Sequence, residues 1–305
     1  MSEQTGYLAA PGFEPQLARA LGQVGEVSAV HGRLFVVPGP ARPMPWALNT
    51  WHELRTLPIT SIGDAVRCLR GLQRNWAHLP STLHRRASLI AEQLPHVSAR
   101  PLEFPAPRPS APLGSWMLLD KHTLLAAPRC SSAFAHGEVQ FVEDRESAPS
   151  RAYLKLWEAL TLLDERPGPG DLCVDLGSSP GGWSWVLQQL GASVISVDKA
   201  PLDPQIAGLA SITHRQESAF GIPPESLGPV AWMVCDIACY PERLLDLVQR
   251  WLASGTCQRF VCTVKLQGEA DDPALEALAA LPESRLVHLF HNKHELTWLR
   301  VPGAL

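Results

Sequence analysis

Apolar and polar positions alternate in a regular order along the second half of the chain. From Ser150 onward, short apolar runs are separated by segments with helical spacing. This alternation is typical of a parallel sheet covered by helices on both faces, so we predict an α/β fold. We expect strands at 172–176, 194–197, 211–214, 231–235 and 260–264, helices at 150–163, 182–190, 241–253 and 273–281, and a closing hairpin of 287–291 and 295–299 turning at Asn292-Lys293.

The first half has a less regular pattern and predicts a smaller α/β accessory domain. Five prolines between Pro101 and Pro112 exclude a regular helix or a central strand there and indicate a linker. We therefore divide the chain into an accessory region, residues 1–147, and a second domain, residues 148–305. Within the first region the spacing predicts helices at 14–21, 61–76 and 81–94 and strands at 33–37, 116–126 and 138–142.

A glycine-rich turn follows the apolar run 172–176. Its pattern, Gly-x-x-x-Gly-Gly, differs from the Gly-x-Gly-x-x-Gly that seats a pyrophosphate at a helix N-terminus. The next apolar run ends at Asp198, about 20 residues later, which is the spacing at which a carboxylate binds the two ribose hydroxyls of a nucleoside. These features favour a nucleoside cofactor without phosphates, of which S-adenosylmethionine is the common one.

Two polar residues follow apolar runs at positions where parallel strands would end. Asp236 comes after the run 232–235 and Lys265 after 261–264, and ligands of open α/β sheets bind beyond such carboxyl ends. The chain has only five lysines against 21 arginines. A lysine is therefore an uncommon choice here, and lysine, unlike arginine, can lose its proton when its surroundings lower its pKa.

Five ordered motifs give the chain a recognisable resemblance. They are Ser150-Arg-Ala-Tyr-Leu-Lys-Leu156, Asp175-Leu-Gly-Ser-Ser-Pro-Gly-Gly-Trp183, Cys235-Asp236, Val264-Lys265-Leu266 and His294-Glu295-Leu296. Together they resemble the FtsJ/RrmJ-type 2′-O-ribose RNA methyltransferases, and most of all the RlmM-type enzymes that methylate a cytidine of large-subunit ribosomal RNA. The resemblance covers roughly residues 148–302. It implies a Rossmann-like class I S-adenosylmethionine-dependent methyltransferase fold.

The resemblance also assigns residues. The catalytic set falls on Lys155, Asp236, Lys265 and Glu295. We expect Lys265, kept partly neutral by nearby positive charge, to orient the ribose hydroxyl and accept its proton, without a metal ion. The S-adenosylmethionine site falls on Asp175, Gly177, Ser178, Ser179, Pro180, Gly181, Gly182, Trp183, Asp198, Glu217 and Asp236.

The sequence departs from the family pattern in three places. Ser178 and Ser179 replace small apolar residues or cysteine, and Glu217 stands where aspartate is usual. The front region is also shorter than in the RlmM-type enzymes, so we expect at most a partial THUMP-like RNA-binding module there.

Charge is distributed unevenly along the chain. Residues 1–150 carry 14 basic and 12 acidic side chains, a net charge of +2, whereas residues 151–305 carry 12 and 18, a net charge of −6. Five arginines and no acidic residue lie between Ala65 and Ala91, and the spacing places Arg67, Arg70 and Arg74 on one helix face. They predict either a phosphate-binding surface for an RNA partner or an ordinary solvated helix face.

Other classes of protein are disfavoured. The chain has no 18-residue apolar span and no secretion signal, so we expect a cytoplasmic protein without a membrane contact. Seven cysteines form no CxxC pair and are expected to be reduced thiols. His288, His291 and His294 could suggest a metal site, but on a hairpin their side chains would not converge. Two alternatives stay open: a methyltransferase of the same fold acting on a base or small molecule, and a catalytically silent RNA-binding or assembly factor.

Overall fold

The computed structural model describes residues 3–266 and 273–303 and divides the chain into two compact units. Unit 1 comprises Met1–Leu102 and Arg108–Gln140, and unit 2 comprises Glu103–Pro107 and Phe141–Leu305. Five residues of the proline-rich stretch therefore group with unit 2, although the residues on both sides of them group with unit 1. None of the described helices combines the length and the hydropathy needed to cross a lipid bilayer.

Unit 2 is built on one seven-stranded sheet. Its strands are β10 (Leu172–Leu176), β11 (Ser193–Val197), β12 (Ile212–Arg215), β13 (Trp232–Cys235), β14 (Phe260–Lys265), β15 (Ser284–Val287) and β16 (Glu295–Arg300). Their order is β12-β11-β10-β13-β14-β16-β15, with β16 antiparallel to both of its neighbours and the others parallel. The strand order reverses beside β10, which places the loops after β10 and β13 at the switch point where α/β sheets bind ligands.

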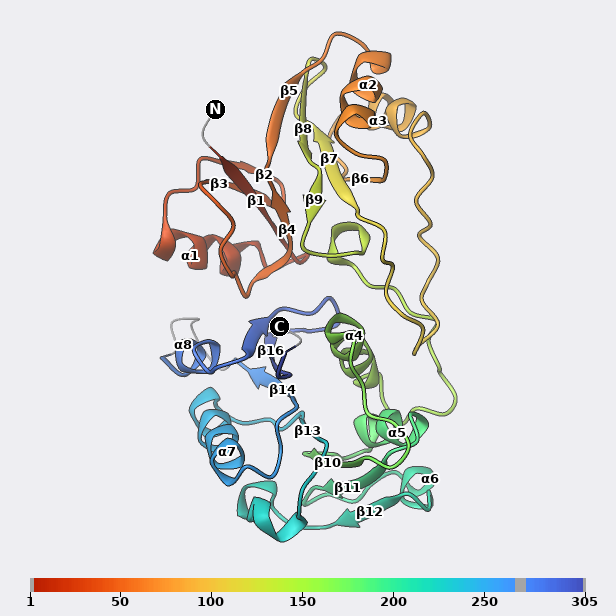
Figure 1. Ribbon diagram of the computed structural model, residues 1–305, viewed down its shortest axis with the longest axis vertical. Coiled ribbons are helices and arrows are strands. Elements are labelled where there is room, and N and C mark those ends of the chain that lie inside the picture. Colours follow the sequence, from red (N-terminus) through yellow and green to blue (C-terminus); the bar gives the residue numbers. More distant parts are fainter. Residues whose placement is uncertain (1–2, 267–272, 304–305) are drawn as a thin grey trace. The chain divides into compact units, whose positions relative to one another are not determined.

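Helices cover both faces of this sheet, as the sequence predicted. They are α4 (Tyr153–Leu163), α5 (Gly182–Gln189), α6 (Pro204–Ala207), α7 (Pro241–Ser254) and α8 (Pro273–Ala279), with short 3-10 turns at Ala219–Gly221 and Pro224–Leu227. Helices α4 and α5 pack on one side and α7 and α8 on the other (Figure 1). The α/β methyltransferase-like sheet expected for this half of the chain is confirmed.

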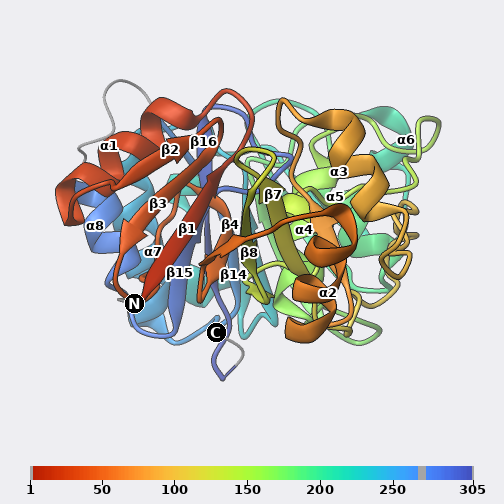
Figure 2. The same cartoon turned by 90° about the horizontal axis from the view of Figure 1, so that it is seen from above.

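Unit 1 contains two further sheets. Its elements are β1 (Gln4–Ala9), α1 (Glu14–Val24), β2 (Ala29–His31), β3 (Leu34–Pro38), β4 (Ala47–His52), β5 (Arg55–Pro58), α2 (Ile62–Leu72), β6 (Trp76–His78), α3 (His84–Ala91), β7 (Gly114–Leu118), β8 (Thr123–Ala127), β9 (Arg129–Cys130) and a 3-10 turn at Ala135–Gly137. One sheet has the order β2-β3-β1-β4-β9 and the other β5-β8-β7-β6. Helices α2 and α3 lie side by side in both views (Figure 1, Figure 2).

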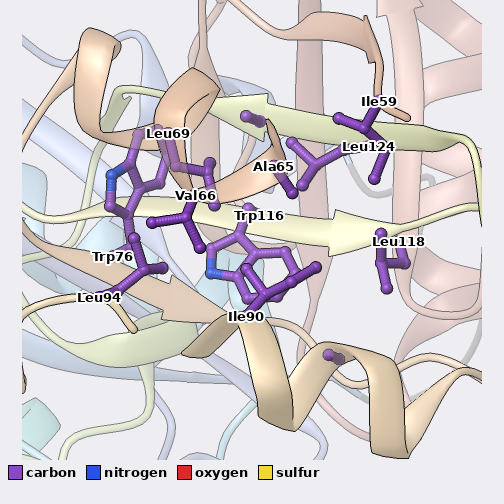
Figure 3. Packing of buried hydrophobic residues seen from close by; sticks show 12 residues of the cluster. Ile59, Ala65, Val66, Leu69, Trp76, Ile90, Leu94, Trp116, Leu118 and Leu124 are labelled. Atoms are coloured by element: carbon purple, nitrogen blue, oxygen red, sulfur yellow. The ribbon is translucent and has the colours of Figure 1, made fainter. Parts of the chain in front are cut away.

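The second sheet of unit 1 is buried on both faces. On one face, Val66 and Leu69 of α2 and Ile90 of α3 pack around the fully buried indole of Trp116 on β7 (Figure 3). On the other face, Met117 and its neighbours pack against residues of the first sheet. Burial on both sides leaves the outer surface of the helices for charged side chains, and Arg67, Arg70 and Arg85 are exposed there.

Several predicted boundaries in unit 1 were wrong. Residues 116–126 form a hairpin instead of one strand, because Asp120 accepts a hydrogen bond from the backbone N–H of His122 (2.6 Å) and turns the chain between β7 and β8. Residues 138–142 form no strand and contribute only an isolated pairing to Leu102. The helix predicted at 61–76 ends at Leu72, because Trp76 starts β6 and pairs with β7. Strands β1, β2, β4, β5, β6 and β9 were not predicted.

The closing hairpin of unit 2 also differs from its prediction. Its strands are β15 and β16, so the connection runs from 288 to 294 and is longer than a turn at Asn292-Lys293. All seven cysteines are free thiols, as expected, and five of them are buried.

Candidate active site

Four charged side chains form a closed ring at the carboxyl end of the unit 2 sheet. The Lys155 Nζ lies 2.8 Å from both carboxylate oxygens of Asp236 and 3.0 Å from Glu295. The Lys265 Nζ lies 3.1 Å from Asp236 and 2.5 Å from Glu295. Each ammonium group therefore contacts both carboxylates, and the four charges sum to zero.

The fold explains why these four residues meet. Lys265 is the last residue of β14 and is paired across the ladder with Glu295, the first residue of β16. Asp236 follows β13 and donates its backbone N–H to the carbonyl of Leu176 at the end of β10 (3.2 Å). Lys155 arrives from the first turn of α4. The structure thus brings together all four residues that the resemblance assigned to catalysis.

Lys265 differs from its partners in accessibility. Its side chain is 26% exposed, against 9% for Lys155 and 8% for Glu295. Burial by itself lowers the pKa of Lys265, but the charge of Asp236 and the contacts with Glu295 outweigh it, so the pKa is raised above its ordinary value. This direction favours the ammonium form in the free site, and the partial neutrality expected of Lys265 beside a bound sulfonium stays a prediction.

The ring lines a cavity of about 580 Å³ in unit 2. Besides the four ring residues, its walls carry the basic side chains of Arg151, His291 and Lys293. The cavity is thus rich in cations although its domain is acidic overall.

A buried carboxylate one helical turn after Lys155 fixes one wall of this cavity. Glu158 is only 1% exposed and accepts hydrogen bonds from the backbone N–H groups of Phe290 (2.8 Å) and His291 (3.0 Å). Its second oxygen also lies 2.7 Å from Nδ1 of His291. Glu158 therefore supports the loop that contains Phe290 and His291.

The glycine turn after β10 packs closely against neighbouring loops. Gly177 has φ +78°, and a Cβ there would lie 2.4 Å from Ile237, in the loop that follows Asp236. Gly181 has φ +115°, and a Cβ there would lie 2.7 Å from Ile206. Both positions require glycine for conformation and for space.

Asp198 and Ser179 join this turn to the end of β11. Asp198 accepts hydrogen bonds from the backbone N–H groups of Ser179 (3.1 Å) and Ala200 (2.9 Å). Ser178 is buried and its hydroxyl has no partner in the described part of the chain, whereas the hydroxyl of Ser179 donates to the carbonyl of Pro201 (2.8 Å). Glu217 lies exposed beyond β12.

Asp175 sits fully buried inside β10, below the glycine turn. One of its oxygens accepts a hydrogen bond from Ser184 of α5 (2.6 Å), and that hydroxyl also contacts Ser196 of β11. The other oxygen has no partner within the described residues. Burial raises the pKa of Asp175 to about 7, and the nearby charge of Asp236 adds to the effect while the Ser184 hydrogen bond opposes it.

Trp183 contacts the catalytic helix. Its indole N–H donates to the carbonyl of Ala152 (2.8 Å), just before α4, and its ring centroid lies 5.7 Å from the Lys155 Nζ. These contacts hold Lys155 in place, whereas a role of Trp183 in cofactor binding stays a prediction.

The histidines near the ring do not form a metal cluster. Among the residues that the structure describes, no three His, Cys, Asp or Glu side chains are placed to hold a metal ion. His291 contacts Glu158, and the Nε2 of His288 lies 3.3 Å from the carbonyl of Lys293.

Sequence reasoning missed the supporting residues. Lys155 and Glu158 are the two charged residues of α4, and the other residues of this helix are uncharged. A carboxylate in such an apolar helix was the available signal that Glu158 has a specific partner. Lys293 was noticed only as a turn residue, and Arg151 only as part of a motif. Ser184 and Ser196 gave no signal, because each lies inside an element that reads as ordinary buried structure.

Comparisons with known proteins agree with this geometry. The family described as FtsJ-like methyltransferase matches residues 148–277. The "Ribosomal RNA large subunit methyltransferase M" of Halorhodospira halophila is 35% identical over 159 residues, which cover 50% of this chain and 46% of that protein. The protein of the same name from Xanthomonas oryzae pv. oryzae is 31% identical over 256 residues, covering 79% of this chain and 70% of that protein.

Coverage differs among these relatives. Against the Halorhodospira protein the chain spans about half of the relative's length. A solved structure, the ribosomal protein L11 methylase of Lactobacillus delbrueckii subsp. bulgaricus, matches 48% of this chain and 77% of its own with 16% identity and a TM-score of 0.35, which carries no functional inference. The match to the Xanthomonas protein extends over most of both chains, and the family match contains three of the four ring residues, Lys155, Asp236 and Lys265. The chain belongs to the FtsJ-like methyltransferase family.

Proposed function

We propose that this protein is an S-adenosylmethionine-dependent RNA 2′-O-ribose methyltransferase acting on a cytidine of large-subunit ribosomal RNA. The observation that carries the proposal is the ring of Lys155, Asp236, Lys265 and Glu295 in a cavity at the carboxyl ends of the sheet. The names of the relatives support ribosomal RNA as the substrate.

The residues present fit S-adenosylmethionine. Three carboxylates, Asp175, Asp198 and Asp236, stand at or near the ends of β10, β11 and β13 and influence one another electrostatically. A buried oxygen of Asp175 without a partner among the described residues suits a ligand that carries positive charge. Asp198 would hold the ribose hydroxyls, while the tightly packed turn around Gly177 and Gly181 would let the backbone approach the ligand.

S-adenosylmethionine supplies a methyl group on a positively charged sulfur. Lys265, the more exposed ammonium, would meet the ribose 2′-hydroxyl and orient its oxygen for in-line attack. Positive charge brought next to the ring would lower the pKa of Lys265, so that Lys265 could release its own proton to solvent and then accept the hydroxyl proton on its neutral nitrogen. Asp236 and Glu295 hold the two lysines in place, so the proton acceptor is positioned before the reaction starts.

Methyl transfer by purified protein tests the proposal. Wild-type protein with radiolabelled S-adenosylmethionine should methylate large-subunit RNA from cells lacking this protein, and the label should resist alkaline hydrolysis as a 2′-O-methylated dinucleotide. Lys265→Ala should lose about 10²–10⁴-fold in turnover while calorimetry shows retained cofactor affinity. Lys121→Ala, in the exposed turn between β7 and β8, is the matched control.

The alternatives predict different results. A label on the base would indicate the same fold acting at another acceptor. A catalytically silent binding factor would retain RNA without any transfer of label. Near wild-type turnover by Lys265→Ala would remove Lys265 from the mechanism.

A further inference from the structure

The cations of the ring cavity are not equally neutralised. Lys155 and Lys265 share the two carboxylates of Asp236 and Glu295, and Arg151 lies 2.7 Å from Glu143. Lys293 is exposed, and within residues 3–266 and 273–303 no carboxylate oxygen lies within 4.0 Å of its nitrogen. Among the side chains that the structure describes, Lys293 therefore gives the cavity a positive charge that no carboxylate neutralises.

The loop that carries Lys293 is held on both sides of it. The carboxylate of Glu158 accepts a hydrogen bond from the backbone N–H of His291 and also contacts the His291 ring. His291 lies two residues before Lys293. The side chain of Asn292 is buried and exchanges hydrogen bonds with the hydroxyl of Thr297 on β16 (3.1 and 3.2 Å). Two residues after Lys293, Glu295 enters the ring. The loop is thus a fixed support that connects Lys293 to the reacting groups.

We propose that Lys293 binds the phosphodiester group beside the ribose whose 2′-hydroxyl enters the ring. This inference rests on the proposed function and assigns a phosphate site to that same cavity. A ribose within RNA brings at least one negatively charged phosphate close to its 2′-oxygen, and an exposed ammonium that no described carboxylate neutralises is suited to it. Uncharged small-molecule acceptors would gain nothing from this lysine.

The charge distribution explains why this contact matters. Unit 2 contains the whole segment 151–305, whose net charge is −6. Such a surface repels phosphate except where cations gather, and within the cavity Lys293 supplies that attraction without opening the ring. Glu158 acts as a positioning residue for it, because it holds the loop on which Lys293 stands.

The test measures the salt dependence of binding for a fluorescein-labelled oligocytidylate RNA 12-mer by anisotropy. Each phosphate contact in single-stranded nucleic acid contributes about 0.7 to the slope of log K against log salt. Lys293→Gln should therefore weaken binding at low salt and flatten the slope by about 0.7, whereas Lys293→Arg should restore both. Arg285→Gln is the matched control, since Arg285 lies on β15 of the same sheet, toward the end of the ladder away from Glu295.

Two outcomes overturn the inference. One is an unchanged slope in Lys293→Gln, and the other is an equal loss of affinity and slope in Arg285→Gln, which would indicate a general charge effect.

Glu158→Gln should speed hydrogen exchange at the amides of Phe290 and His291 and partially flatten the slope. Unchanged exchange would remove the positioning role of Glu158. If wild-type protein transfers methyl groups while Lys293→Gln leaves the salt slope unchanged, only this inference fails. If the slope responds but no methyl is transferred, the proposed function fails and the phosphate site stands.

Discussion

Asp175 is a carboxylic acid in an environment very different from that of a free side chain. It is fully buried, one of its oxygens has no partner among the described residues, and its pKa is raised to about 7. Between about pH 4 and pH 7 the folded chain therefore keeps a proton that the unfolded chain has released. The free energy of unfolding should fall as pH rises through this window and then level off above it.

The first prediction follows from that linkage. Asp175→Asn replaces the carboxyl, which is mostly ionised at pH 8, with a neutral amide of similar shape. It should therefore stabilise the cofactor-free protein at pH 8 by up to about 4 kcal/mol, with a smaller gain at pH 5. Urea unfolding at both pH values measures the difference in the free energy of unfolding between the variant and wild type. Asp246→Asn on the exposed face of α7 controls for the loss of a charge. The same change should weaken binding of the cationic cofactor. A gain that does not depend on pH would contradict this account.

At this scale the sequence revealed the ring but not its support. Lys265, Asp236 and Glu295 stand at strand ends, where ordered motifs identify them without any knowledge of packing. The hydrogen bonds of Glu158 join residues 132 and 133 positions apart, and no local pattern encodes such a pairing. The raised pKa of Lys265 was missed for the same reason, because it depends on two carboxylates that only the fold brings close.

Among the elements of unit 2, the turn between β10 and α5 depends strictly on residue type. Gly177→Ala should destabilise the protein, by about 1–2 kcal/mol for the left-handed conformation and a further ~1–3 kcal/mol for the clash with Ile237. Gly168→Ala is the control, since nothing lies within 4 Å of a Cβ there, and it should change stability by no more than about 0.5 kcal/mol. Thermal unfolding of both variants measures the difference, and equal melting temperatures would show that the turn adapts.

Elements of unit 2 were predictable because most of its strands are continuous apolar runs, as expected when both faces are buried. Strands of unit 1 follow another rule. In β1, Gly6 faces the side chain of Trp51 so closely that a Cβ would lie 3.1 Å from it, so the strand is specified by its partners β3 and β4 more than by its own residues. Local sequence patterns identify strands that are continuous apolar runs and miss strands that are specified by their neighbouring strands.

At the scale of the whole molecule, the two units carry different kinds of basic group. Unit 2 places Arg151, Lys155, Lys265 and Lys293 around one cavity, whereas unit 1 exposes arginines on and after α2. Arg67 is 76% exposed and pairs with Asp64 (3.0 Å), and such exposed pairs contribute little to stability. Arg70 donates to the carbonyl of Gln93 (2.6 Å), and Arg74 lies beyond the end of α2, so the single helix face predicted for the three arginines is not observed.

These arginines can still serve RNA, since phosphate binding needs exposed charge and not a shared helix face. Replacing Arg67, Arg70 and Arg74 by glutamine should weaken binding of substrate RNA and flatten the salt slope by about 0.7 for each phosphate that these side chains neutralise, with unchanged S-adenosylmethionine affinity. The matched triple variant changes Arg166, Arg250 and Arg285, all exposed in unit 2, and should leave the slope nearly unaltered. Equal slopes in wild type and the unit 1 variant would show that those arginines contact solvent and bind no RNA phosphate. RNA affinity would then depend on the cavity cations and on basic groups elsewhere, and Lys293→Gln would account for a larger share of the total slope.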